Sequence, residues 1–210
     1  MKSYNIQATI YDIFGYLIPG IIILFFSNIV YRQVTLGGLA YPRIINLTTT
    51  IIIMIIVGGY ILGHALSGFS SLVVEPLITR QIKFTAIRLS LENILSENMT
   101  NYFNKKFNTI FGFDFHPTDF RAVICYVETH RPAVYATAFV FLSFYGMCRT
   151  LAFTFSIIFL TELAVWFIFS QKYSLMIALI CLILSFSFYY GYFKFYRYFK
   201  VQLFSGFVIP

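Results

Sequence analysis

Four residues with charged or titratable side chains stand within or beside long apolar runs of the sequence: Asp12, His64, Arg149 and Glu162. Such side chains are costly in membrane hydrocarbon and usually face protein or water there. We expect Asp12, His64 and Arg149 on the same side of a membrane, where Asp12 would pair with Arg149 and neutralise a half-buried charge. Two roles stay open for this group. The first is structural, in which the group fixes the order in which the helices pack. The second is a gate or protonation switch, because histidine titrates near neutral pH.

Glu162 is a separate case, because it lies about twelve residues into the apolar run that starts near Thr150. A carboxyl group at that depth is protonated, lines a water-filled path, or faces an oligomer interface. We expect a structural hydrogen bond to a serine of the following helix, with Ser185 and Ser187 as the candidates.

The sequence lacks the patterns of common catalytic and metal sites. It has no Ser-His-Asp order, glycine-rich phosphate loop or Cys/His metal spacing, and its three histidines are His64, His116 and His130. No arginine is followed by a histidine with four to six residues between them, which is the spacing of HEPN ribonucleases. We therefore expect no enzyme activity, no bound metal and no cofactor.

Composition places the chain in a membrane. Only 11% of its 210 residues are charged and 59% are hydrophobic, whereas soluble domains carry about 25% charged residues. Runs of roughly 20 apolar residues can cross the hydrocarbon core, and four are present, at about 13–30, 48–74, 150–169 and 173–193. We predict an all-α integral membrane protein with four transmembrane helices. Residues 133–148 are either the start of a long helix that runs into the third span, which we prefer, or a short fifth membrane element.

The positions of Lys and Arg predict the orientation. Four spans place both chain ends and the 75–149 segment on one side, with twelve of the fifteen basic residues; Arg32, Arg43 and Lys172 fall on the other. Cytoplasmic loops collect Lys and Arg, so we predict a multi-pass protein with both termini in the cytoplasm. This topology accounts for the net charge of +7, and direct binding to nucleic acid is not expected.

The chain divides into three expected segments. Residues 1–74 form an N-terminal helical hairpin, 75–149 an amphipathic helical cytoplasmic segment, and 150–210 a C-terminal hairpin with a tail. Within the middle segment we expect a helix over 83–107, a turn over 112–118, a helix capped by Thr118 or Asp119, and a break at Pro132. The basic face of this segment comprises Lys83, Arg88, Lys105 and Lys106. Three roles stay open for this face: it is exposed to solvent, contacts anionic lipid, or binds a partner.

Small residues predict close helix packing in the first two spans. Gly15 and Gly20 flank Pro19, which should kink the first span. Gly59 and Gly63 form a G-x-x-x-G pattern in the second span, and this spacing lets helices approach closely. The pattern leaves open whether the contact lies inside one chain or between chains.

The stretch from Tyr11 to Gly20, YDIFGYLIPG, resembles the first helix of small multipass proteins encoded in bacterial antiviral defence loci. The four-span plan and the Cys148-Arg149-Thr150 stretch resemble the membrane accessory protein of type VI-B CRISPR systems that lacks the HEPN motif. The resemblance implies an accessory in the bacterial inner membrane that modulates RNA-guided interference, with the lipid bilayer and a soluble defence effector as partners. It carries over no catalytic residue.

Three functions follow from these features. The first is a non-enzymatic defence accessory or effector that forms a homo-oligomer and perturbs the membrane, or that modulates a soluble effector. The second is a membrane scaffold that recruits a cytoplasmic partner. The third is a small channel or transporter, although four spans without an internal repeat argue against a standard secondary transporter.

Overall fold

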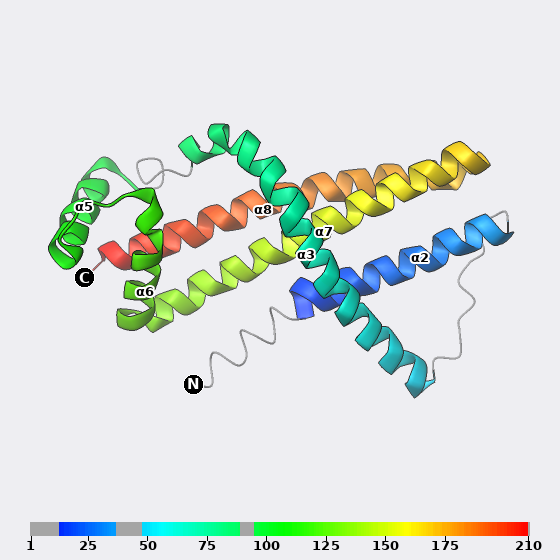
Figure 1. Ribbon diagram of the computed structural model, residues 1–210, viewed down its shortest axis with the longest axis horizontal. Helices are drawn as coiled ribbons and strands as arrows, with labels where there is room; N and C mark the ends of the chain where they lie inside the picture. The colour runs from blue at the N-terminus through cyan, green and yellow to red at the C-terminus, as the bar shows by residue number, and fades with distance from the viewer. Residues whose placement is uncertain (1–12, 37–47, 89–94, 210) are drawn as a thin grey trace.

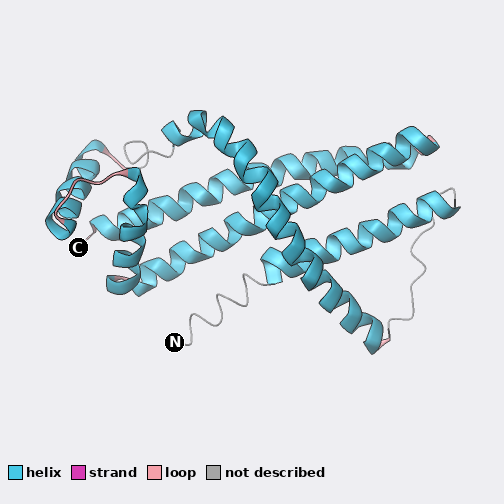
Figure 2. Ribbon diagram, viewed as in Figure 1, coloured by secondary structure: helices cyan, strands magenta, loops and turns pink. Residues whose placement is uncertain are grey.

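The computed structural model describes residues 13–36, 48–88 and 95–209, and for residues 75–88 it describes the helix but not the side chains. The described chain is helical throughout, with short connecting turns (Figure 2). Its elements in order are η1 (Ile13–Leu17), α2 (Ile18–Leu36), α3 (Thr49–Arg88), α5 (Glu97–Phe111), η2 (Pro117–Asp119), α6 (Phe120–His130), α7 (Pro132–Phe169) and α8 (Lys172–Val208).

The prediction of four membrane-crossing helices is confirmed. Four described helices are long and apolar enough to span a membrane, and they include the four predicted runs. Each extends beyond the predicted limits, most clearly α7 with 38 residues and α8 with 37. At about 1.5 Å per residue these two helices are about 55 Å long, whereas the hydrocarbon core is about 30 Å thick. A large part of each must therefore project beyond the lipid.

Helices α7 and α8 form the longest unit of the molecule, lying side by side along their length (Figure 1). The turn between them is short, with Ser170 in the left-handed conformation at φ 53° and its N–H donating to the Trp166 carbonyl. Along the hairpin, Leu151, Ile158 and Cys181 are buried in one apolar cluster. Helix α2 packs on this cluster through Ile18, Ile22 and Ile23, and α3 crosses α2 and α7 obliquely (Figure 1).

Far from that turn, α5, η2 and α6 pack on the Pro132 end of α7 and the Val208 end of α8 (Figure 1). We call this unit the helical cap. Its core is aromatic, and Phe103, Phe107 and Phe207 are completely buried there. Asp119 stands at the N-cap position of α6, and Pro132 begins α7 after a break at Arg131. The position of Asp119 and the break at Pro132 are as predicted, but the Asp119 side chain forms no capping hydrogen bond with α6.

The helices of the middle segment differ in part from those expected. The helix expected over 83–107 is interrupted, because Leu95 and Ser96 are not helical and α5 begins at Glu97. Helix α3 continues to Arg88, past the end expected for the second span at residue 74. Residues 133–148 belong to α7, as preferred. The expected segment boundaries at 74/75 and 149/150 thus fall inside continuous helices.

Candidate functional site

Arg149, from the middle of α7, reaches across to α3. Its Nη2 atom donates to Ser67 Oγ at 3.5 Å. One turn earlier on α3, His64 stacks on Tyr16 of η1 with ring centroids 3.8 Å apart and meets the edge of Tyr60. Arg149 therefore contacts α3 one helical turn from His64. Asp12, their expected third member, lies outside the described residues.

The glycines of the first two spans form the contact between η1–α2 and α3. A Cβ atom on Gly20 would overlap the carbonyl oxygen of Gly59, and one on Gly63 would overlap the carbonyl oxygen of Tyr16. A Cβ on Gly59 would lie 2.8 Å from Ile21 Cγ1. The G-x-x-x-G pattern thus serves a contact within one chain, which answers the question that the sequence left open.

Pro19 and Gly15 lie at the start of the same contact, and both are buried. Pro19 is the second residue of α2 and follows η1 without a break, so its missing N–H interrupts the hydrogen bonding between the two helical segments. The winding changes from a π-helix, η1, to an α-helix immediately before it. The change of winding occurs where the sequence predicted a kink.

A second polar group lies near the turn between α7 and α8. Glu162 of α7 is completely buried, as is Ser174 of α8, and Gln33 of α2 is 3% exposed. Ser174 Oγ donates to Gln33 Oε1 at 3.4 Å, and both side chains lie beside the Glu162 carboxyl group. Ser174 and Gln33 lie close enough to act as donors to the Glu162 carboxyl group, but within the described part of the chain neither Glu162 oxygen, nor Nε2 of Gln33, forms a hydrogen bond of good geometry.

This arrangement differs from the expected partners of Glu162. Ser185 donates instead to the Ala152 carbonyl at 3.0 Å and contacts Ser156 Oγ at 2.8 Å. The sequence analysis missed Gln33 and Ser174. A glutamine so close to an apolar span is itself a signal, but the predicted first span ended at residue 30 and so excluded it.

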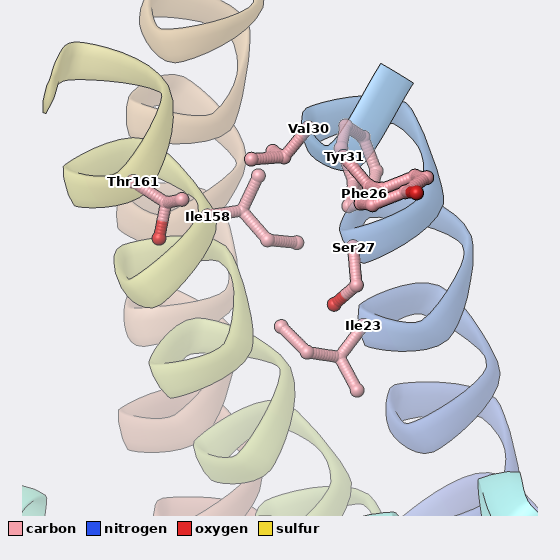
Figure 3. A pocket seen from close by; sticks show the side chains of 7 residues that line it. All are labelled: Ile23, Phe26, Ser27, Val30, Tyr31, Ile158 and Thr161. Atoms are coloured by element: carbon pink, nitrogen blue, oxygen red, sulfur yellow. The ribbon is translucent and has the colours of Figure 1, made fainter. Parts of the chain in front are cut away.

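A groove of about 240 Å³ runs between α2 and α7 on the outside of the bundle (Figure 3). Its walls are apolar except for the hydroxyl groups of Ser27, Tyr31 and Thr161. The Thr161 hydroxyl already donates to the Ile157 carbonyl within its own helix. The groove is therefore an indentation in the apolar face of the bundle and offers little hydrogen bonding to a ligand.

The basic residues predicted to share one helix are divided between two. Lys83 and Arg88 belong to α3, whereas Lys105 and Lys106 belong to α5. The Lys106 ammonium lies 5.9 Å from the centre of the Tyr126 ring and 5.5 Å from that of Phe207. Burial, and to a smaller extent the positive charge of Arg131, lowers the pKa of Lys106 below its ordinary value.

Helix α5 also carries apolar side chains on its exposed surface. Met99, Tyr102, Ile110 and Phe113 are 39–49% exposed. Met99, Tyr102 and Ile110 lie on one face of α5 at helical spacing, and Phe113 follows its end. We call these four residues the α5 stripe. Large apolar side chains gathered on a surface outside a membrane are typical of interaction sites.

The polar turn of the cap uses its own side chains. The His116 N–H donates to Asp119 Oδ2 at 3.0 Å, and His116 Nδ1 lies 2.9 Å from Thr118 Oγ1. Asp114 accepts from Asn108 at 2.8 Å. These contacts close the turn before α6, so the histidine and aspartates have a structural role at this position.

In comparisons with known proteins, no protein-family model, curated protein or solved structure matches the chain.

Proposed function

We propose that the protein is a non-enzymatic accessory of a bacterial antiviral defence system of CRISPR type, set in the inner membrane with the cap in the cytoplasm. The resemblance of residues 11–20 and the excess of Lys and Arg on the cap side support this placement. In this proposal the cap binds a soluble effector of the system and holds it at the membrane.

The observation that carries the proposal is the α5 stripe. Its four large side chains lie on the cap, at the end of the hairpin that projects beyond the lipid. Outside a membrane, such a surface gains free energy when a partner covers it, at about 25 cal/mol per Å² of apolar area. Lys105 on the same helix is exposed and adds positive charge for an acidic partner surface.

The test is phage interference in cells that carry the effector gene adjacent to this one. Tyr102→Glu and Ile110→Glu place a charge in the α5 stripe, and we expect each to remove most of the change in plating efficiency caused by the wild-type protein. Asn101→Glu adds the same charge to another exposed face of α5 and should behave like the wild type. Equal activity in all three variants would contradict docking on this surface.

A membrane-potential dye in the same cells tests the other branch of this function, in which the protein oligomerises and perturbs the membrane. We expect the potential to stay unchanged on expression, with and without the phage trigger. Depolarisation that persists in Tyr102→Glu would show that the protein acts on the membrane itself, and would overturn the docking proposal.

A further inference from the structure

We propose that Gln33, Glu162 and Ser174 form a site inside the membrane-spanning bundle that binds one monovalent cation, with the Glu162 carboxylate as the charged ligand. The site joins three helices, α2, α7 and α8. It lies two helical turns from the end of α7, so about 10 Å along the helix from the turn at Ser170.

The first argument is the state of the carboxylate. Glu162 is completely buried, and neither of its oxygens accepts a hydrogen bond of good geometry from a described residue. Removing a carboxylate from water costs several kcal/mol unless a positive charge or well-placed hydrogen-bond donors compensate it. Two neutral neighbours, Ser174 and Gln33, lie beside the carboxyl group, and no described Lys, Arg or His donates to its oxygens, so a bound cation would supply the missing positive charge.

The second argument is the chemistry of the neighbours. Gln33 Oε1 and Ser174 Oγ lie 3.4 Å apart beside the carboxyl group, so the site gathers carboxylate, amide and hydroxyl oxygens. Oxygen ligands are those that hard cations prefer. One carboxylate balances one positive charge, which selects a monovalent over a divalent cation in a low-dielectric interior.

Two sources supply such a charge, an alkali metal ion and a proton. A proton on Glu162 would donate to Gln33 Oε1, and Gln33 Nε2 would donate back to the second carboxylate oxygen. An alkali ion would use the same oxygens as ligands. The Cys181 thiol of α8 lies near enough to feel the charge of Glu162 and is itself uncharged at neutral pH. The site depends on these side chains alone and is independent of the defence function proposed above.

The experiment follows thermal unfolding of the protein in lipid nanodiscs. Trp166 is the single tryptophan and lies one turn from Glu162, so its fluorescence reports on the site. Sodium chloride is titrated against choline chloride of equal ionic strength at fixed pH, and pH is then lowered in choline chloride alone. We expect the unfolding midpoint to rise saturably in one of these series, which identifies the occupant as sodium or as the proton.

Glu162→Gln should lose the response in both series, because the amide carries no charge. Glu128→Gln, which removes an exposed carboxylate of α6, should keep it. If Glu162→Gln fails to fold, Gln33→Leu and Ser174→Ala retain the carboxylate and should weaken the apparent affinity for sodium about tenfold each, as expected for loss of a ligand to a charged group. A wild type that responds to neither cation, or the same response in Glu162→Gln or in both ligand variants, would overturn the proposal.

Discussion

The contact between α2 and α3 and the core of the helical cap lie in the same chain but use opposite packing. In the first, the absence of side chains at Gly20 and Gly63 lets two helix backbones touch. In the second, phenylalanine rings fill the space between helices, with the ring centroids of Phe103 and Phe207 4.9 Å apart. The exposed faces differ as well: α3 presents a continuous apolar run from Ile52 to Val57 to its surroundings, whereas the cap surface is mostly polar.

The difference follows from the two solvents. Lipid tails are as apolar as leucine, so burying large apolar side chains drives little association between membrane helices, and close backbone approach provides the attraction instead. In water the same burial is favourable, and aromatic rings add 0.5–1.5 kcal/mol per pair in edge-to-face or offset geometry, as an order of magnitude. The contrast in packing is therefore consistent with the proposed placement of the cap outside the lipid, as is the length of the hairpin.

The largest expected effect comes from emptying the cap core. Phe107→Ala removes a completely buried ring that meets Phe103, Phe111 and Phe207, and should destabilise the cap by about 3–5 kcal/mol. Hydrogen exchange followed by mass spectrometry should show faster exchange in α5 and α6 with no change in α2 and α3. Phe113→Ala, at a side chain that is 48% exposed, is the matched control and should have a small effect. Equal loss of protection in α2 and α3 would show that cap and bundle unfold as one unit.

The next largest loss of stability is expected from the opposite change, in which a side-chain atom is added where α3 touches the backbone of η1 and α2. Gly63→Ala places a methyl group on the Tyr16 carbonyl and should cost about 1–3 kcal/mol. Gly68→Ala, on the same helix with no atom within 4 Å of the added Cβ, should stabilise α3 by up to about 1 kcal/mol, because glycine is a poor helix former. Unfolding in detergent mixtures measures both. Equal effects at the two positions would mean that α2 and α3 are not in backbone contact.

The bundle was more predictable from the sequence than the polar sites within it. Hydropathy shows where helices cross a membrane, and the excess of small residues at Gly59 and Gly63 shows where they approach. Neither property indicates which helices meet. The sequence drew attention to Glu162, but its neighbours Gln33 and Ser174 come from two other helices, 129 and 12 positions away in the chain, and only the packing of the helices brings them together.

The cap shows a second limit of sequence reasoning. The periodic apolar pattern correctly predicted helix around 97–107. The same spacing of apolar residues continues through Leu95 and Ser96, however, so the pattern did not show that the helix is interrupted there. Leu95 is buried in the cap core. The side chain that continued the apolar pattern of the predicted helix therefore packs into the cap core at the non-helical residues just before α5.

A smaller effect is expected from the charge that the cap partly buries. Burial and the nearby Arg131 lower the pKa of Lys106 from its ordinary value of 10.5. Between the lowered pKa and that value the unfolded chain binds more protons than the folded one, so cap stability should rise with pH in that window. Pulse proteolysis in urea, from about pH 8 to about pH 10, should show this rise. Lys106→Met should reduce it most and Arg131→Gln less, whereas Arg121→Gln removes an exposed charge of α6 and should leave it unchanged.

The smallest effect concerns the polar contact between α7 and α8. Ser156 Oγ and Ser185 Oγ lie 2.8 Å apart, and each lies within hydrogen-bond distance of the Ala152 carbonyl, so one hydroxyl can donate to the carbonyl while the other donates to its neighbour. A double-mutant cycle with Ser156→Ala and Ser185→Ala should give a coupling of only about 0.6 kcal/mol, because helices separated within a membrane find other partners for such hydroxyls. A coupling well above about 2 kcal/mol would mean that hydrogen bonds, rather than fitted surfaces, hold this hairpin together. The α7–α8 contact would then be held by hydrogen bonds, whereas the cap core is held by packed aromatic rings.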